Sequence, residues 1–155
     1  MKNFAIYFLA IVLTLTLSCK QEVNVEAEKE NVKSILASYV TSVEEEDMEL
    51  YSKNILQDTA MVNFGGFGDP IIGWDALKEV MEGQNSALSE TKITVSNLEI
   101  KVSESGKFAF ATCLWNLKAI MKEGPVELPV RCTFILEKQE SGWIIVHFHK
   151  SISAG

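Results

Sequence analysis

The sequence predicts an α+β domain in which a curved antiparallel sheet wraps around helices that come first in the chain. Apolar residues recur at helical spacing in the first half of the chain, and they alternate with polar residues along four long runs in the second half. Short turns that contain glycine separate these runs, so consecutive strands are antiparallel neighbours. Residues 30–155 are enough to bury one core, and we expect a single cone-shaped domain with its helices on one side of the sheet.

Residues 1–18 have the order of a secretory signal: a positive start at Lys2, an apolar run, and the small Ser18 directly before Cys19. The apolar run is shorter than the roughly 20 residues that a membrane-spanning helix needs. The three residues before the cysteine resemble the bacterial lipobox, with Thr16 in the position that usually holds leucine. We therefore expect a signal peptide, lipidation of Cys19, and a protein anchored in the bacterial cell envelope outside the cytoplasm; plain secretion is the alternative.

The formal net charge of the chain is −7, and no basic cluster is visible in the sequence. Binding to nucleic acid needs such a cluster, so it is not expected. Residues 19–29 comprise the lipidated cysteine and a polar, glutamate-rich stretch that is typical of a flexible tether between the membrane and the domain.

Residues 30–46 are predicted to form an amphipathic helix. Its apolar positions follow the spacing i, i+3, i+4, i+7, i+8 and i+11, at Val32, Ile35, Leu36, Tyr39, Val40 and Val43. A short helix over 47–53 and a short strand over 60–64 follow. The glycine-rich loop 65–70 is expected to form the mobile rim of a cleft, and a further helix is expected over 73–85.

Four strands make up the rest of the chain. They are expected over residues 91–103, 107–121, 126–138 and 143–151. In the first strand the apolar residues change parity, which predicts a bulge near Ser96 and Asn97. In the last two strands the even positions are almost all apolar and should face the helices. Cys113 and Cys132 lie inside strands and are expected to be buried free thiols.

Several features resemble the nuclear transport factor 2-like superfamily, and its SnoaL-like branch most closely. These features are Asp47 after the first helix, Gly73 and Trp74 at the start of a later helix, and the alternating pattern of residues 131–151. Residues 146–151 are also similar to the end of the association (hub) domain of calcium/calmodulin-dependent kinase II. The resemblance implies a pocket between sheet and helices, but it implies no single activity, because the superfamily includes isomerases, dehydratases, cyclases, transport factors and assembly domains.

The similarity to the hub domain implies which side chains point into this pocket. The basic residue after the second histidine corresponds to Lys150, and the pocket positions on the two preceding strands fall on Phe134 and Leu114. We therefore expect a mostly apolar pocket for a small apolar or aromatic ligand that carries one anionic or carbonyl group. The expected ligand-binding residues are Tyr39, Phe64, Trp74, Leu114, Asn116, Phe134, Phe148 and Lys150.

The odd positions of the last strands form a mixed face that suits a second copy of the chain in a homodimer. The expected interface residues are Trp115, Arg131, Thr133, His147 and His149. The two histidines lack a third ligand, so no metal site is predicted, and no cofactor is indicated.

Acid–base chemistry would need a carboxylate at the pocket, and Asp47, Asp69 and Asp75 are the candidates near its rim. Helix caps and turns account for these residues equally well. Three hypotheses therefore stay open: a ligand-binding lipoprotein domain without assigned catalysis, a cyclase, isomerase or dehydratase that acts on a small carbonyl compound, and a dimeric assembly module.

Overall fold

The computed structural model describes residues 23–152, so the predicted signal peptide and Cys19 lie outside the described residues. The elements are α2 Val25–Glu44, α3 Met48–Asn54, β1 Val62–Asn63, β2 Ile71–Ile72, α4 Trp74–Ala87, β3 Ser89–Val102, β4 Phe108–Met121, β5 Gly124–Gln139 and β6 Gly142–Ile152. Within these residues no helix is both long and apolar enough to cross a membrane.

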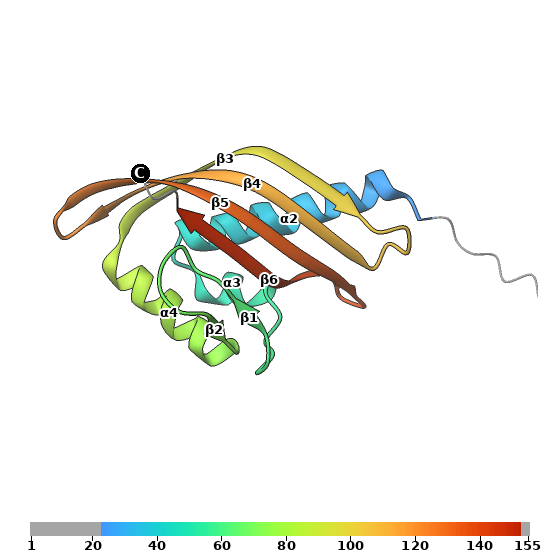
Figure 1. Cartoon of the computed structure of the whole chain (residues 1–155), viewed down its shortest axis with the longest axis horizontal. Coiled ribbons are helices and arrows are strands. Elements are labelled where there is room, and N and C mark those ends of the chain that lie inside the picture. Colours follow the sequence, from blue (N-terminus) through green and yellow to red (C-terminus); the bar gives the residue numbers. More distant parts are fainter. Residues whose placement is uncertain (1–22, 153–155) are drawn as a thin grey trace, which may run out of the picture.

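The four long strands form one antiparallel sheet in the order β3-β4-β5-β6. Figure 1 shows the sheet curving over α2, with α3, α4 and the β1–β2 hairpin on the same side. The buried apolar residues lie mainly between this concave face and the helices. The predicted α+β fold, with its curved antiparallel sheet and N-terminal helices, is confirmed.

The predicted bulge in β3 is present. Ser96 pairs with Leu114 but Glu99 pairs with Thr112, so β3 carries one extra residue between these pairs. Asn97 adopts a φ of 52°, in the left-handed region that asparagine tolerates better than most residues. The bulge bends the strand and contributes to the curvature of the sheet.

A bulge in β6 was not predicted. Ile135 pairs with His147 whereas the next residue of β5 pairs with Ile145, so Val146 is the extra residue. Trp143 and Ile145 consequently face the core, and only from Phe148 onward do even positions face inward. The prediction that all even positions of this strand face the helices was wrong, because an extra residue reverses the alternation.

The helix α2 begins at Val25, within the segment predicted as tether. The Asn24 side chain caps the helix by accepting a hydrogen bond from the Ala27 N–H at 3.1 Å. One turn later, the Glu28 carboxylate accepts hydrogen bonds from Lys138 Nζ at 2.6 Å and Trp143 Nε1 at 2.7 Å. The prediction of a tether up to residue 29 was wrong, because these contacts dock the polar start of the helix on the sheet.

The hairpin of β1 and β2 positions the glycine-rich loop over the end of β6. Asn63 Oδ1 accepts a hydrogen bond from the Phe148 N–H at 2.8 Å, which ties β1 to β6. At the other end of the hairpin, Gly73 has a φ of 82°, and a Cβ there would lie 2.8 Å from the Thr59 carbonyl oxygen. Glycine is therefore required where the chain enters α4.

The two cysteines stand opposite each other on neighbouring strands. Cys113 of β4 pairs with Cys132 of β5, and both are buried free thiols, as predicted.

The Glu28 contacts lead to a prediction about stability. Glu28→Ala should lower the free energy of unfolding by about 1–2 kcal/mol at neutral pH, because it leaves the Trp143 N–H without its charged partner. The hydrogen bonds from Lys138, and then from Trp143, hold the pKa of Glu28 below its usual range. The stabilisation should therefore be complete above the ordinary glutamate pKa and disappear as the pH falls through the lowered one.

Urea unfolding of the wild type and the variant, at neutral pH and in acid, measures this effect. Glu26→Ala is the matched control, because Glu26 lies in the same helical turn and its side chain is 81% exposed. Equal losses in the two variants would contradict an anchoring role for Glu28.

Candidate functional site

The most unusual group on the concave face is the ammonium of Lys150. The β6 strand places this residue opposite Cys132 and two residues after the buried Phe148, so both side chains lie on the same face of the strand. Its Nζ donates a hydrogen bond to Tyr39 Oη at 2.9 Å. It also lies 4.7 to 5.1 Å from the ring centroids of Tyr39, Trp115 and Phe148. Lys150 therefore points inward and sits among three aromatic rings, which attract a cation through their π faces.

These rings belong to a larger aromatic cluster centred on Tyr39. Tyr39 of α2 packs against Phe134 at 5.6 Å, against Tyr51 at 5.2 Å and against Trp115 at 6.0 Å, measured between ring centroids. Trp74, at the start of α4, stacks on Tyr51 at 6.4 Å. The hydroxyls of the two tyrosines lie 3.4 Å apart. The cluster thus joins three helices to the sheet around one amine.

The electrostatic surroundings of Lys150 lack an opposite charge. Within residues 23–152, every ion pair involves another lysine, and no carboxylate oxygen lies within 4 Å of Lys150 Nζ. Burial lowers the pKa of Lys150, because water is excluded from the ammonium. Burial also raises the pKa values of Tyr39 and Tyr51 well above their usual range, so both remain neutral hydroxyls.

Two cavities lie on opposite sides of the aromatic cluster. The first, which we call the lysine cavity, has a volume of about 530 Å³ and lies between the glycine-rich loop, α4 and β6. Lys150 and Phe148 line it from the sheet, Leu77 and Met81 line it from α4, and Asp69 lines it from the loop. It therefore combines mostly apolar walls with one amine and one carboxylate.

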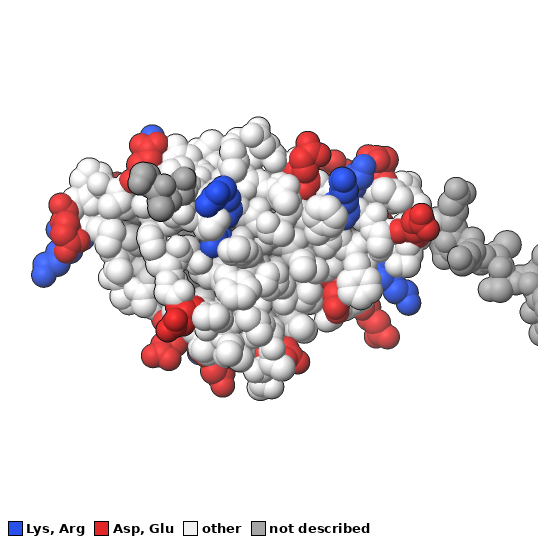
Figure 2. Space-filling view, in the orientation of Figure 1, with Lys and Arg blue, Asp and Glu red and all other residues white. Residues whose placement is uncertain are grey.

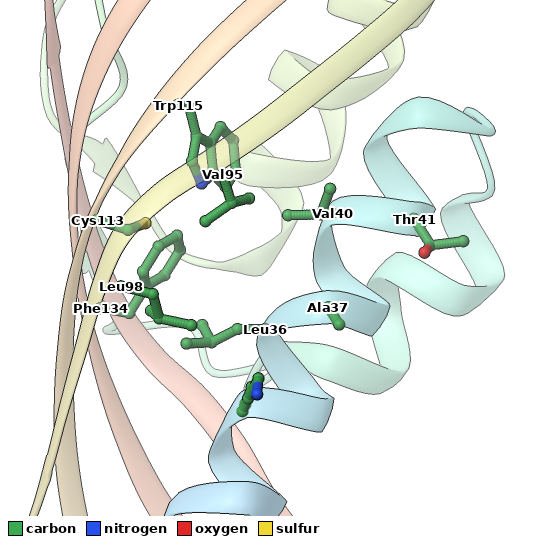
Figure 3. A pocket seen from close by; sticks show the side chains of 10 residues that line it. Leu36, Ala37, Val40, Thr41, Val95, Leu98, Cys113, Trp115 and Phe134 are labelled. Atoms are coloured by element: carbon green, nitrogen blue, oxygen red, sulfur yellow. The ribbon is translucent and has the colours of Figure 1, made fainter.

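The second cavity, which we call the α2 cavity, has a volume of about 330 Å³ and lies between α2 and strands β3 to β5. Figure 3 shows Leu36, Leu98, Cys113, Trp115 and Phe134 directed toward a common space. Because Trp115 lies against Lys150, which lines the other cavity, the aromatic cluster forms the wall between them. The single pocket expected from the sequence is therefore divided in two.

The prediction of which face of β4 is buried was wrong. Trp115 was expected at the outer dimer face, but it is 3% exposed and lies in the core; Leu114 was expected in the pocket, but it lies on the outer face and is 42% exposed. The two-residue turn from Met121 to Gly124 places odd residues of β4 opposite even residues of β5. Asn116 consequently also lies on the outer side, where its Nδ2 donates to Glu127 Oε1 at 2.7 Å.

Phe64 is a further correction. Its ring packs against His147 and His149, with centroids 5.8 and 5.4 Å away, so it lies outside both cavities. The main chain after β1 runs beside β6 and carries this side chain to the outer layer. Among the other expected ligand residues, Lys150 and Phe148 line the lysine cavity, Phe134 lines the α2 cavity, and Tyr39 and Trp74 belong to the cluster.

The histidines lie away from both cavities. A hydrogen bond of 2.6 Å joins His147 Nδ1 and the Val62 carbonyl oxygen and holds β1 against β6. His149 and Arg131 are exposed, and Thr133 is half-buried beside them on the outer face. No group of three or more His, Cys, Asp or Glu side chains that could hold a metal ion occurs in the described part of the chain.

Of the three candidate aspartates, Asp69 alone lines a cavity. Asp47 caps α3 by accepting a hydrogen bond from the Leu50 N–H at 2.9 Å, and Asp75 is an exposed residue in the first turn of α4. Tyr51 was not identified from the sequence, because its position in a short helix gave no indication that its hydroxyl would meet that of Tyr39.

Residues 32–155 match the family model of the SnoaL-like domain, whereas no curated protein matches the sequence. Among solved structures, a protein from Streptomyces avermitilis, provisionally described as a dehydratase of the nuclear transport factor 2-like family, has a TM-score of 0.76 at 14% identity. The match covers 84% of this chain and 99% of that one.

A nuclear transport factor 2-like protein from Salmonella enterica gives a TM-score of 0.76 at 20% identity, with 84% of this chain and 94% of that chain covered. The CaMKII hub of S. rosetta gives 0.68 at 21% identity, with 80% and 95% covered. At these identities the similarity shows a shared fold. The resemblances stated from the sequence are confirmed for both the SnoaL-like domain and the hub.

The isolation of Lys150 leads to a second prediction. Lys150→Met should raise the free energy of unfolding at neutral pH by about 1 kcal/mol, because removal of a half-buried cation without a carboxylate partner outweighs the lost hydrogen bond to Tyr39 and the lost attraction of the rings. Below the lowered pKa of Lys150 this difference should be complete. It should shrink as the pH rises toward the ordinary lysine pKa, because the unfolded wild type then binds more protons than the folded one.

Denaturant unfolding at several pH values tests this, with Lys78→Met as the control. Lys78 lies on α4 with its side chain 50% exposed, so its replacement should change stability little. A loss of more than about 2 kcal/mol in Lys150→Met would show instead that the amine is a structural anchor.

Proposed function

The chain belongs to the family of SnoaL-like domains, and from this premise we propose that it binds a small apolar ligand with one carbonyl or carboxylate group in the lysine cavity. The observation that supports the proposal is the amine of Lys150, a residue that lines that cavity, without a carboxylate partner in the described residues. A buried polar group of this kind is stabilised when a ligand oxygen accepts its hydrogens.

The hydrogen-bonding capacity of Lys150 supports this proposal. A lysine ammonium has three N–H donors, and the one hydrogen bond that its side chain makes to the described residues is to Tyr39. Donors thus remain for the oxygen of a ligand bound in the cavity. The walls contributed by Leu77, Met81 and Phe148 would enclose the apolar body of such a ligand, and the cavity volume is in the range usual for small-molecule sites.

A second candidate function is catalysis on a small carbonyl compound. Asp69 lines the same cavity as Lys150, which provides one carboxylate to move a proton and one cation to stabilise the developing oxyanion. An isomerase or dehydratase would use such a pair. The similarity to the Streptomyces avermitilis protein supports this candidate only through the shared fold.

We also propose that Cys19 is lipidated and anchors the protein in the cell envelope, from the order of charge, apolar run and small residue that precedes it. Because α2 begins at Val25, five residues separate Cys19 from this helix. Such a segment spans at most about 18 Å, so the domain would lie close to the membrane surface.

The outer face of the sheet is proposed as the contact with a second copy of the chain. Phe110, Leu114 and Ile135 lie there, each at least 40% exposed, beside Arg131. Figure 2 shows charged side chains spread over the face in view without a basic cluster. The hub of S. rosetta shares the fold, and burial of the apolar outer residues would be the driving force for association.

Ligand binding is tested with a panel of medium-chain and aromatic carboxylic acids, aldehydes and ketones, by isothermal titration. We expect at least one class to bind the wild type and to bind Lys150→Met about tenfold or more weakly, since a charge-assisted hydrogen bond is lost. Lys33→Met, in the wall of the α2 cavity, should bind normally.

Loss of binding in Lys33→Met but not in Lys150→Met would move the site to the α2 cavity. Product formation by the wild type that is abolished in Asp69→Asn, with binding retained, would establish the enzyme instead of the binding protein.

The dimer is tested by light scattering. The wild type should have the mass of two chains, and Leu114→Glu should have the mass of one, because the substitution places a charge in the apolar contact. Val80→Glu is the control, since Val80 is equally apolar and 47% exposed but lies on α4. A monomeric wild type would contradict the proposed dimer.

A further inference from the structure

We propose that Lys150 is a nucleophilic amine that condenses with an aldehyde or ketone bound in the lysine cavity and holds it as an imine. This inference rests on the proposed function and specifies its ligand class and its chemistry. It depends on four features of the structure: the position of the amine, its lack of a counter-charge, the hydroxyl beside it, and the cavity in front of it.

The surroundings of Lys150 favour the neutral, nucleophilic form of the amine. The three aromatic rings near Nζ attract an ammonium, but less strongly than an ionised carboxylate would, and no carboxylate oxygen of the described chain lies within 4 Å of Nζ. Exclusion of water disfavours the charged form and lowers the pKa of the amine. Low polarity also favours an imine over its hydrolysis, because it limits the access of water.

The other lysines of the described chain either have a carboxylate partner or, as for Lys101, Lys107 and Lys122, are exposed to water, which favours their charged form. The seven ion pairs of the described residues all involve lysines, at positions 29, 33, 53, 78, 92, 118 and 138. A carboxylate near an ammonium favours its protonated form and so suppresses its nucleophilicity. Lys53 shows this effect: Glu49 raises its pKa. Lys150 should therefore differ in reactivity from the rest of the chain.

The condensation is balanced without any further reagent. The lone pair of Nζ forms a bond to the carbonyl carbon, the π electrons move to the oxygen, and a proton passes from nitrogen to oxygen to give a carbinolamine. The carbinolamine oxygen then gains a second proton, the nitrogen lone pair forms the C=N bond while the C–O bond breaks, and water leaves. The iminium nitrogen gives up its remaining proton, which replaces the one delivered to the oxygen. One amine and one carbonyl thus give one imine and one water.

Tyr39 is placed to assist the proton movements. Its hydroxyl lies 2.9 Å from Nζ and 3.4 Å from the Tyr51 hydroxyl. Both tyrosines keep their protons because burial raises their pKa values, so each can accept one proton while it donates another. Tyr39 is therefore the proton relay at the reacting nitrogen, and Tyr51 is a positioning residue behind it.

The walls of the cavity indicate which carbonyl compounds fit. Leu77, Met81 and Phe148 would surround the group attached to the carbonyl carbon, so an aliphatic chain or an aromatic ring is favoured. In the described lining, Lys150 is the single cation, and it is consumed as the nucleophile; Asp69 is the single anion. A neutral aldehyde or ketone should therefore react better than a keto acid of the same size.

The experiment traps the imine on the unmodified protein. Hexanal and benzaldehyde are incubated with the folded chain and sodium cyanoborohydride at neutral pH, and the reduced adduct is located by peptide mass mapping. We expect one adduct at Lys150, formed about tenfold or more faster than at Lys78 of the same molecule. Tyr39→Phe should slow adduct formation with less effect on the affinity for the aldehyde, measured by quenching of tryptophan fluorescence.

The outcomes separate this inference from the proposed function. One outcome is that the adduct forms no faster at Lys150 than at Lys78, although the aldehydes bind and Lys150→Met lowers their affinity. That outcome overturns the imine and leaves the proposed ligand binding unchanged. Absence of both adduct and aldehyde binding overturns the imine, and the proposed function is overturned with it only when the carboxylic acids and ketones of the titration panel also fail to bind. A Lys150→Arg variant that still acquires the fast adduct would place the reactive amine elsewhere and also overturn the inference.

Discussion

The orientation of every side chain in β4 depends on the two-residue turn that joins this strand to β5. Only two residues separate Met121 from its partner Gly124, so odd residues of β4 stand opposite even residues of β5. That pairing brings Trp115 to the concave face, beside Tyr39 of α2. A turn one residue longer would turn the strand over and leave Lys150 without the indole that now lies against its amine.

The sequence predicts the elements well, because their periodicity is a local property, and in β4 the alternation also indicates which face is buried. Every odd position of β4 from Ala109 to Met121 is apolar, whereas Thr112, Asn116 and Lys118 stand at even positions. The face was assigned wrongly because the pocket position was taken from the resemblance to the hub domain, which placed Leu114 inward, whereas Leu114 is exposed. In β6 the extra residue Val146 reverses the alternation partway along the strand. The inward orientation of Lys150 was predicted correctly, because Lys150 follows the bulge and is two residues after Phe148, on the same face of the strand.

The start of α2 shows a different limit of local reasoning. The segment that precedes residue 30 is polar and charged, which is typical of a tether, and its order comes from contacts made more than a hundred residues away. Glu28 stabilises the start of α2 only because Trp143 and Lys138 of the sheet donate hydrogen bonds to its carboxylate. Composition describes what a segment can bury, but not which partner the fold will bring to it.

The position of Lys150 is difficult to explain by stability alone. A methionine of similar length would fill the same space among the rings without the desolvation of a charge, and the aromatic cluster is held together by Tyr39, Trp115 and Phe134 in either case. A group that the fold does not need, and that faces a cavity, is best explained by what enters that cavity. The architecture shared with proteins less than 25% identical accounts for the sheet and helices, so any function particular to this chain has to be sought in features such as the amine, its neighbouring hydroxyl and the cavity beside it.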